Sequence, residues 1–215
     1  MPRSTRFRSF ALAVVVAVAA ACADAPTSPS ALTADALGGG PSLARSAQVK
    51  QREDAEKQRV KQEREATKAY YQALKKAWKK GKKLRNPEVM SCEPQEYDAD
   101  VKVIGPEGGE LKMGPHKLVI PPGALSEEVV ITAEAPVSEA VEVRFSPHGL
   151  TFAAQPELTL SYKQCFVPQG FDYRIAYVDE WLNVLEWPFS VNEKHTDEVT
   201  AWIDHFSGYV VAYRK

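Results

Sequence analysis

Near the end of the chain, the stretch "HFSGY" places a base two residues before a nucleophile. In an extended strand, residues two apart share a face, so the imidazole of His205 could approach the hydroxyl of Ser207. A serine activated by histidine could attack the carbonyl of Phe206 and cut the chain. The same residues also fit an ordinary closing strand, in which Phe206 and Tyr209 pack in a core. The rest of the sequence must decide between these two interpretations.

Other residue types that perform chemistry are scattered along the chain. The histidines show no spacing typical of metal ligands, and most stand in or beside predicted turns. No phosphate-binding loop, dinucleotide fingerprint or nucleophile elbow is present. The acidic residues are dispersed among strands and turns, so no pair of carboxylates can be nominated for acid–base catalysis. We therefore expect no metal, no cofactor and no enzymatic activity.

Cys22 follows a segment that is typical of exported proteins. Three arginines precede "FALAVVVAVAAA", an apolar run too short to span a bilayer as a helix. A cysteine directly after such a run resembles the lipobox of bacterial lipoproteins, although Ala19 stands where leucine is usual. The rival interpretation is cleavage at "ACA", residues 21–23, which would release the protein. We expect residues 1–21 to be a lipoprotein signal peptide, with Cys22 lipidated and the chain anchored in the bacterial cell envelope, on its periplasmic or cell-surface side.

The other two cysteines are expected to pair. Three thiols in an exported chain leave an odd one, and lipidation of Cys22 removes it. Cys92 and Cys165 then form a disulfide, because such bonds persist in an oxidising compartment. The alternative is two free buried thiols.

Charge divides the chain into segments. The net charge of −1 hides about +10 over residues 45–85 and about −12 over residues 86–215. Residues 22–42 are rich in alanine, proline, serine and glycine, so we expect a flexible tether there. Residues 43–86 contain many good helix formers and predict a basic helix that ends at Asn86-Pro87. We expect this helix to stand largely free of the domain that follows.

One face of the predicted helix has the pattern of a membrane-surface helix. Tyr70, Leu74 and Trp78 recur every four positions, and lysines such as Lys75 and Lys79 stand beside them. Such a face can lie on an anionic lipid surface, so we expect a fragment of residues 43–86 to bind anionic vesicles. Two alternatives are a solvated spacer and a basic helix that folds back onto the acidic domain. Export makes nucleic acid a poor partner.

The sequence predicts a folded domain over residues 87–215. About ten short β-branched and aromatic runs follow Asp100, separated by turn residues at the spacing of a β-sandwich. We therefore predict a mainly β protein, an antiparallel β-sandwich preceded by the long basic helix and the signal and tether segments. The aromatic residues of "FDYRIAYVDEWLNVLEWPF" are assigned to the core and to cross-strand pairs. The alternative places Trp181 or Trp187 outside, as a platform for sugar rings.

Two stretches carry a family resemblance: "IGPEGGELKMGPHKLVIPPGALSEEVVITAEA" and "FSPHGLTFAAQPELTLSY". Together they resemble the ZU-5 domain of zonula occludens proteins, netrin receptors, ankyrins and bacterial envelope proteins, most clearly over residues 101–163. The resemblance implies a β-sandwich that serves as an interaction or scaffold module. Within it, Pro122-Gly123 suits the centre of a type II turn, because proline presets φ and glycine accepts a positive φ.

The resemblance also bears on "HFSGY". Relatives in death-domain scaffolds and inflammasome sensors cut themselves between a phenylalanine and a serine, through an ester that water hydrolyses. Here Ser207 would be the nucleophile, Phe206 would supply the carbonyl and His205 would be the base. Only residues 207–215 would be released, with no effector domain after the cut. We therefore expect a non-catalytic envelope module that binds an unknown protein or polymer, with autoproteolysis as the alternative.

Overall fold

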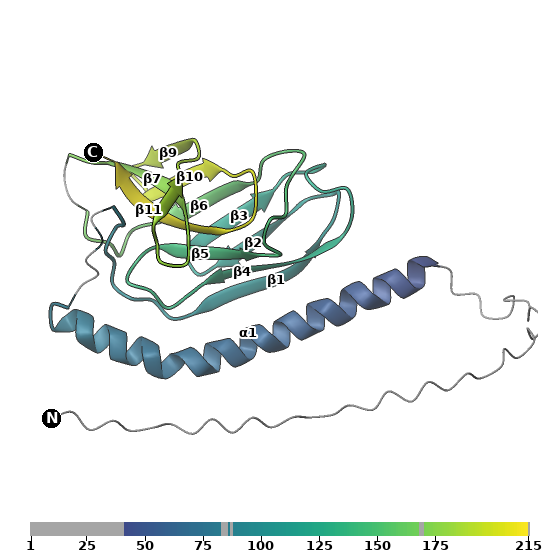
Figure 1. The fold of residues 1–215 in the computed structure, drawn as a ribbon, viewed down its shortest axis with the longest axis horizontal. Helices are drawn as coiled ribbons and strands as arrows, with labels where there is room; N and C mark the ends of the chain where they lie inside the picture. The colour runs from purple at the N-terminus through teal and green to yellow at the C-terminus, as the bar shows by residue number, and fades with distance from the viewer. Residues whose placement is uncertain (1–40, 83–85, 87, 168–169, 215) are drawn as a thin grey trace, which may run out of the picture. The chain divides into compact units, whose positions relative to one another are not determined.

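The computed structural model describes residues 41–82, 86, 88–167 and 170–214. Helix α1 (Pro41–Lys79) precedes two antiparallel sheets (Figure 1). One sheet has the strand order β1 (Asp98–Ile104), β4 (Val129–Ala135), β5 (Glu142–Ser146), β11 (Gly208–Arg214), β7 (Asp172–Val178) and β8 (Val184–Glu186). The other has the order β2 (Gly109–Met113), β3 (His116–Ile120), β6 (Glu157–Ser161), β10 (Glu198–Trp202) and β9 (Ser190–Glu193). The predicted fold, an antiparallel β-sandwich preceded by a helix, is confirmed.

The core lies between the two sheets, where the inward residues of alternating strands meet. Leu111, Leu118 and Leu158 are fully buried there, and they belong to neighbouring strands of the five-stranded sheet. Phe145 and Tyr209 meet them from the six-stranded sheet. Burying one such side chain contributes roughly 1.5–3 kcal/mol, so the strand alternation alone specifies which face turns inward.

Two glycines fix the turns that bring these strands together. Gly123 has a φ of 78°, and the Ala124 N–H donates to the Pro121 carbonyl at 3.2 Å, which confirms the predicted type II turn. Gly108 has a φ of 75° and lies against backbone: a Cβ there would stand 2.4 Å from the carbonyl oxygen of Ile120. Only glycine fits this approach between neighbouring segments.

A short segment before β1 connects the two sheets. The Met90 N–H donates to the Val211 carbonyl at 3.1 Å, beside β11. The Glu93 N–H donates to the Gln164 carbonyl at 2.9 Å, beyond the end of β6. Between them, Cys92 is bonded to Cys165 across a sequence separation of 73 residues, so the predicted disulfide is confirmed. The segment thus fastens the N-terminal edge of the domain to both sheets.

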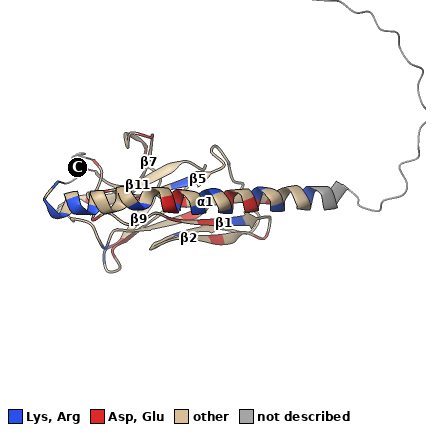
Figure 2. Cartoon of the chain, turned by 90° about the horizontal axis from the view of Figure 1, so that it is seen from below, with Lys and Arg blue, Asp and Glu red and all other residues tan. Residues whose placement is uncertain are grey.

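Helix α1 ends earlier than the sequence predicted. Gly81 adopts a φ of 78°, and the Lys82 N–H donates to the Ala77 carbonyl at 3.1 Å. This bond and the 2.8 Å bond from the Gly81 N–H to Trp78 form a Schellman motif, which stops the helix before Asn86 is reached. In Figure 2 the middle turns of α1 carry both red and blue residues, whereas its C-terminal end carries blue ones without red.

The expectation that the helix stands largely free is wrong, because α1 packs on β1 and β4. Val49, Val60 and Tyr71 are spaced 11 residues apart, which is about three helical turns, so they share one face. Val60 and Tyr71 are buried in a cluster with Val101 of β1 and other apolar residues. The outer face of the sheet is apolar at these positions, and a docked helix removes it from water.

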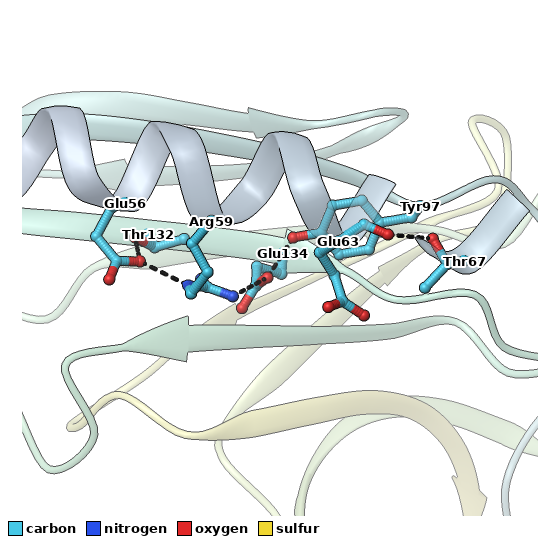
Figure 3. A network of polar contacts seen from close by, with 7 residues as sticks. All are labelled: Glu56, Arg59, Glu63, Thr67, Tyr97, Thr132 and Glu134. Carbon is cyan, nitrogen blue, oxygen red and sulfur yellow. Dashed lines mark hydrogen bonds and ion pairs between the residues drawn. The ribbon is translucent and has the colours of Figure 1, made fainter. Parts of the chain in front are cut away.

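Polar side chains complete this interface, as Figure 3 shows. Arg59 donates to Glu56 on its own helix at 2.9 Å and to Glu134 of β4 at 3.2 Å. The Tyr97 hydroxyl also donates to Glu134, and the Thr132 hydroxyl donates to Glu56 at 3.1 Å. Burial, together with the hydrogen bond to Glu134, raises the pKa of Tyr97. The contact between the basic helix and the acidic domain agrees with the fold-back alternative.

Candidate functional site

The "HFSGY" stretch connects β10 to β11 and holds Phe206 in the core. The Phe206 ring is buried and stacks on Phe145, with 5.0 Å between ring centroids. It also meets Phe152 edge to face at 4.9 Å. Its N–H donates to the Leu150 carbonyl at 2.9 Å, and its carbonyl accepts from the Gly149 N–H at 3.1 Å. These contacts are those of a packing residue in a closing strand.

The contacts that the structure gives His205 do not involve Ser207, the nucleophile of the autocleavage alternative. The His205 ring packs edge-on against Tyr177, with 5.0 Å between ring centroids. No hydrogen bond joins its imidazole to the Ser207 hydroxyl in the described part of the chain. The backbone bends at Asp204 and again at Ser207, so the regular extended strand assumed for the autocleavage alternative is interrupted here. Neither Phe206 nor Ser207 has a positive φ.

The predicted membrane-contact face of α1 is divided between solvent and the sandwich. Tyr70 is exposed, whereas Leu74 packs against the cluster under the helix. Trp78 is half-buried, and Lys79 is exposed in the last turn. Lys75 donates a hydrogen bond of 2.8 Å to the hydroxyl of the tyrosine one turn earlier. The five residues therefore do not form one continuous exposed face while the helix is docked.

A different surface brings one exposed ring together with two half-buried ones, at the edge where β8 and β9 end the two sheets. There Phe189 is 72% exposed, and its ring stacks on Trp202 with 5.7 Å between centroids and 28° between planes. The chain crosses here from β8 to β9. A cleft of about 460 Å³, the β8–β9 cleft, is lined by three rings, a proline, an amide and two carboxylates: Trp187, Phe189, Trp202, Pro188, Gln155, Glu186 and Asp204.

The β8–β9 cleft is negatively charged. Glu186 and Asp204 are both exposed, and neither forms an ion pair with a lysine or arginine among the residues that the structure describes. The Gln155 amide donates to Asp204 at 2.7 Å and so orients this carboxylate. Burial raises the pKa of the Tyr209 hydroxyl, and the charges of Glu186 and Asp204 raise it further. Both carboxylates therefore act on the same part of the sandwich.

The structure corrects the assignment of the aromatic stretch to the core. Its β7 part is buried as predicted, but Trp181 is 72% exposed in the turn between β7 and β8. Trp187 is half-buried against the outer face of the six-stranded sheet. The sequence pattern did not predict that Phe189 lies on the surface. Pro188 was the available signal, because proline cannot donate to a strand ladder and so marks where the chain leaves the sheet.

Several predicted features fall on residues 1–40, outside the described residues. They are the signal peptide, Cys22 and most of the tether, whose last two residues belong to α1. Within the described ranges, no helix is long and apolar enough to cross a membrane. The same ranges contain no group of three or more histidine, cysteine or acidic side chains that could hold a metal ion.

Comparison with known proteins does not assign the chain to a family. No protein-family model matches it, and no curated protein matches it at a significant level. The ZU-5 resemblance stays a prediction that rests on the motifs within residues 101–163. The geometry of the β8–β9 cleft carries the functional proposal.

Proposed function

We propose that the chain is a non-catalytic binding module of the bacterial cell envelope. A ZU-5-like β-sandwich binds a protein or polymer partner at the β8–β9 cleft. The carrying observation is the exposure of Phe189, at 72%, over the stacked ring of Trp202, in a cleft that Glu186, Asp204 and Gln155 border. Exposed apolar groups that gather inside a polar rim mark interaction sites more often than scattered ones do. The packing of Phe206 against Phe145 and Phe152 supports a role without catalysis.

The anchor in this proposal is a lipid on Cys22, which the apolar run before it supports. Helix α1 connects the anchor to the sandwich and, at about 1.5 Å per residue, its 39 residues span roughly 58 Å. The contacts of Arg59 and Tyr71 with the sandwich favour a stiff connection. Binding of α1 to an anionic membrane surface would require Leu74 to leave the sandwich, so we propose it for the isolated fragment of residues 43–86.

Site-specific photo-crosslinking in the envelope tests this function. A photoreactive residue in place of Phe189 should give adducts in the membrane fraction. The control is the same residue in place of the exposed Lys112 on β2, which forms the edge of the five-stranded sheet opposite to β9, and it should give none. The substitution Cys22→Ser should move the protein out of the membrane fraction. A lack of adducts at Phe189, or the same adducts from Lys112, would contradict the proposed site.

A further inference from the structure

The β8–β9 cleft combines ring faces with unpaired negative charge. The stacked pair of Phe189 and Trp202 presents aromatic surface to solvent, because Phe189 is 72% exposed. Glu186 and Asp204 border the same cleft. The residues that line it include no lysine or arginine. Like charges that share a small surface repel each other, and a bound cation would relieve this repulsion.

This chemistry discriminates among ligand classes. An anionic polymer would be repelled by Glu186 and Asp204. A neutral sugar ring could stack on Phe189 but would leave both charges without a counter-ion. A cation held over an aromatic face gains a cation–π attraction and, in this cleft, also meets carboxylates. A cationic ligand therefore uses every feature of the cleft.

Among cations, arginine fits the arrangement best. Its planar guanidinium stacks on aromatic faces and is more weakly hydrated than an ammonium group. Its fork of N–H donors matches a carboxylate. Gln155 already donates to Oδ1 of Asp204, which holds this acceptor in a fixed orientation. Lysine carries a point charge without the flat face, so it should use the ring of Phe189 less well.

We propose that the β8–β9 cleft binds an arginine side chain of a partner polypeptide. The guanidinium lies against the exposed face of Phe189 and donates to Asp204 and Glu186. This inference rests on the proposed function and names the chemistry of the partner. It adds that the partner is a protein with an exposed arginine on its surface.

Titration of the full-length purified protein with capped peptides tests the inference. The probes are Gly-Arg-Gly-Arg-Gly, its lysine and glutamate counterparts, and a neutral β-linked glucose oligosaccharide. Binding is followed by calorimetry at low salt. The arginine peptide should bind most tightly and the lysine peptide less tightly. The glutamate peptide and the oligosaccharide should not bind.

Matched variants separate the cleft from the general negative charge of the domain. Phe189→Ala should weaken binding of the arginine peptide by about twofold to fivefold, the range of one cation–π contact at an exposed site. Glu186→Gln should weaken it by about fivefold, which corresponds to one charge at contact distance in water. Trp181→Ala and Glu180→Gln make the same changes in the exposed turn between β7 and β8, outside the cleft. Both should leave the affinity unchanged.

The outcomes that overturn the inference are distinct from failure of the proposed function. Equal losses for Glu180→Gln and Glu186→Gln would show general attraction to an acidic domain. Preferential binding of the oligosaccharide, abolished by Phe189→Ala, would retain the cleft as a binding site and reject arginine. The crosslinking test of the function needs no peptide, so it stands or fails separately. Circular dichroism of Phe189→Ala verifies that the variant is folded.

Discussion

Replacing His116 by glutamine should flatten the fall in stability between pH 7 and pH 5. His116 begins β3 and is only 5% exposed, and its Nδ1 accepts a 3.2 Å hydrogen bond from the Ser161 N–H. Burial lowers the pKa of His116 from 6.5 to about 4. Protonation at Nδ1 would also turn this acceptor into a donor that faces another donor. The folded protein therefore holds the neutral imidazole.

The sign and size of the effect follow from linkage. Between pH 6.5 and pH 4 the unfolded chain binds a proton at His116 that the folded chain does not. The contribution of His116 to the free energy of unfolding is therefore complete above pH 6.5 and is lost as the pH falls through about 4. Each pH unit between the two pKa values corresponds to about 1.36 kcal/mol, so the full loss is about 3.4 kcal/mol. At pH 5 the loss is about 2 kcal/mol.

Urea unfolding at pH 7 and pH 5, followed by tryptophan fluorescence, measures this contribution. Glutamine can accept the hydrogen bond from the Ser161 N–H but does not titrate. The fall in unfolding free energy from pH 7 to pH 5 should therefore be about 2 kcal/mol smaller in His116→Gln than in the unsubstituted protein. His148→Gln, at an exposed turn, is the control and should follow the unsubstituted protein. A difference below about 0.5 kcal/mol, well under the value from linkage, would refute the assignment of a buried neutral imidazole.

Three further outcomes are expected. Gly123→Ala should lower the free energy of unfolding by about 1–2 kcal/mol, because the left-handed backbone alone is strained by a side chain. Gly108→Ala should lower it distinctly more, because its Cβ would also meet backbone atoms. Equal losses in urea unfolding would contradict this. Replacing Cys92 and Cys165 by serine should lower the free energy of unfolding by about 4 kcal/mol, the chain-entropy value for a loop of this length, and a change under about 1 kcal/mol would show that the loop is otherwise restrained. Intact-mass analysis should find the same C-terminus with and without Ser207→Ala, and a fragment lost from position 207 only in the unsubstituted protein would establish autocleavage.

Much of the sandwich could be predicted from local rules. Strand alternation and the turn residues located the strands, because each inward residue gains burial and each turn needs a specific backbone conformation. The turn at Pro122-Gly123 was predictable for the same reason. The disulfide followed from the odd cysteine count together with export, a constraint that needs no geometry.

The docking of α1 was not predictable in the same way. Its inward stripe is interrupted between Val60 and Tyr71, where polar residues such as Glu63 and Thr67 occur. On the side of α1 that faces the sandwich, Glu56 accepts a hydrogen bond from the hydroxyl of Thr132 of β4. Pairing of this kind depends on long-range contacts, which a helical period cannot show. The available signals were the 11-residue spacing and the opposite net charges of the helix and the domain.

The β8–β9 cleft was hidden by a different cause. Aromatic residues in a strand-rich chain are usually packed in the core, but in this stretch only Tyr173 is buried, and Trp181 and Phe189 are exposed. Phe189 becomes exposed because Pro188 ends the strand pairing and the chain crosses between sheets. Glu186 at the end of β8, Asp204 before β11 and Gln155 before β6 then border the same cleft, so their proximity follows only from the complete topology.

The bridge between Cys92 and Cys165 also decides how the protein responds to mechanical tension. A pull between α1 and a partner at the proposed β8–β9 site first loads the contacts of α1 with β1 and β4. Once these contacts have opened, the force enters the sandwich near Cys92 and can cross the disulfide directly to Cys165. The intervening chain, a separation of 73 residues that contains strands β1 to β6, is bypassed and carries no load along its backbone. The disulfide therefore keeps such a pull from extending the backbone between Cys92 and Cys165, whereas strands β7 to β11 lie outside the bridged loop.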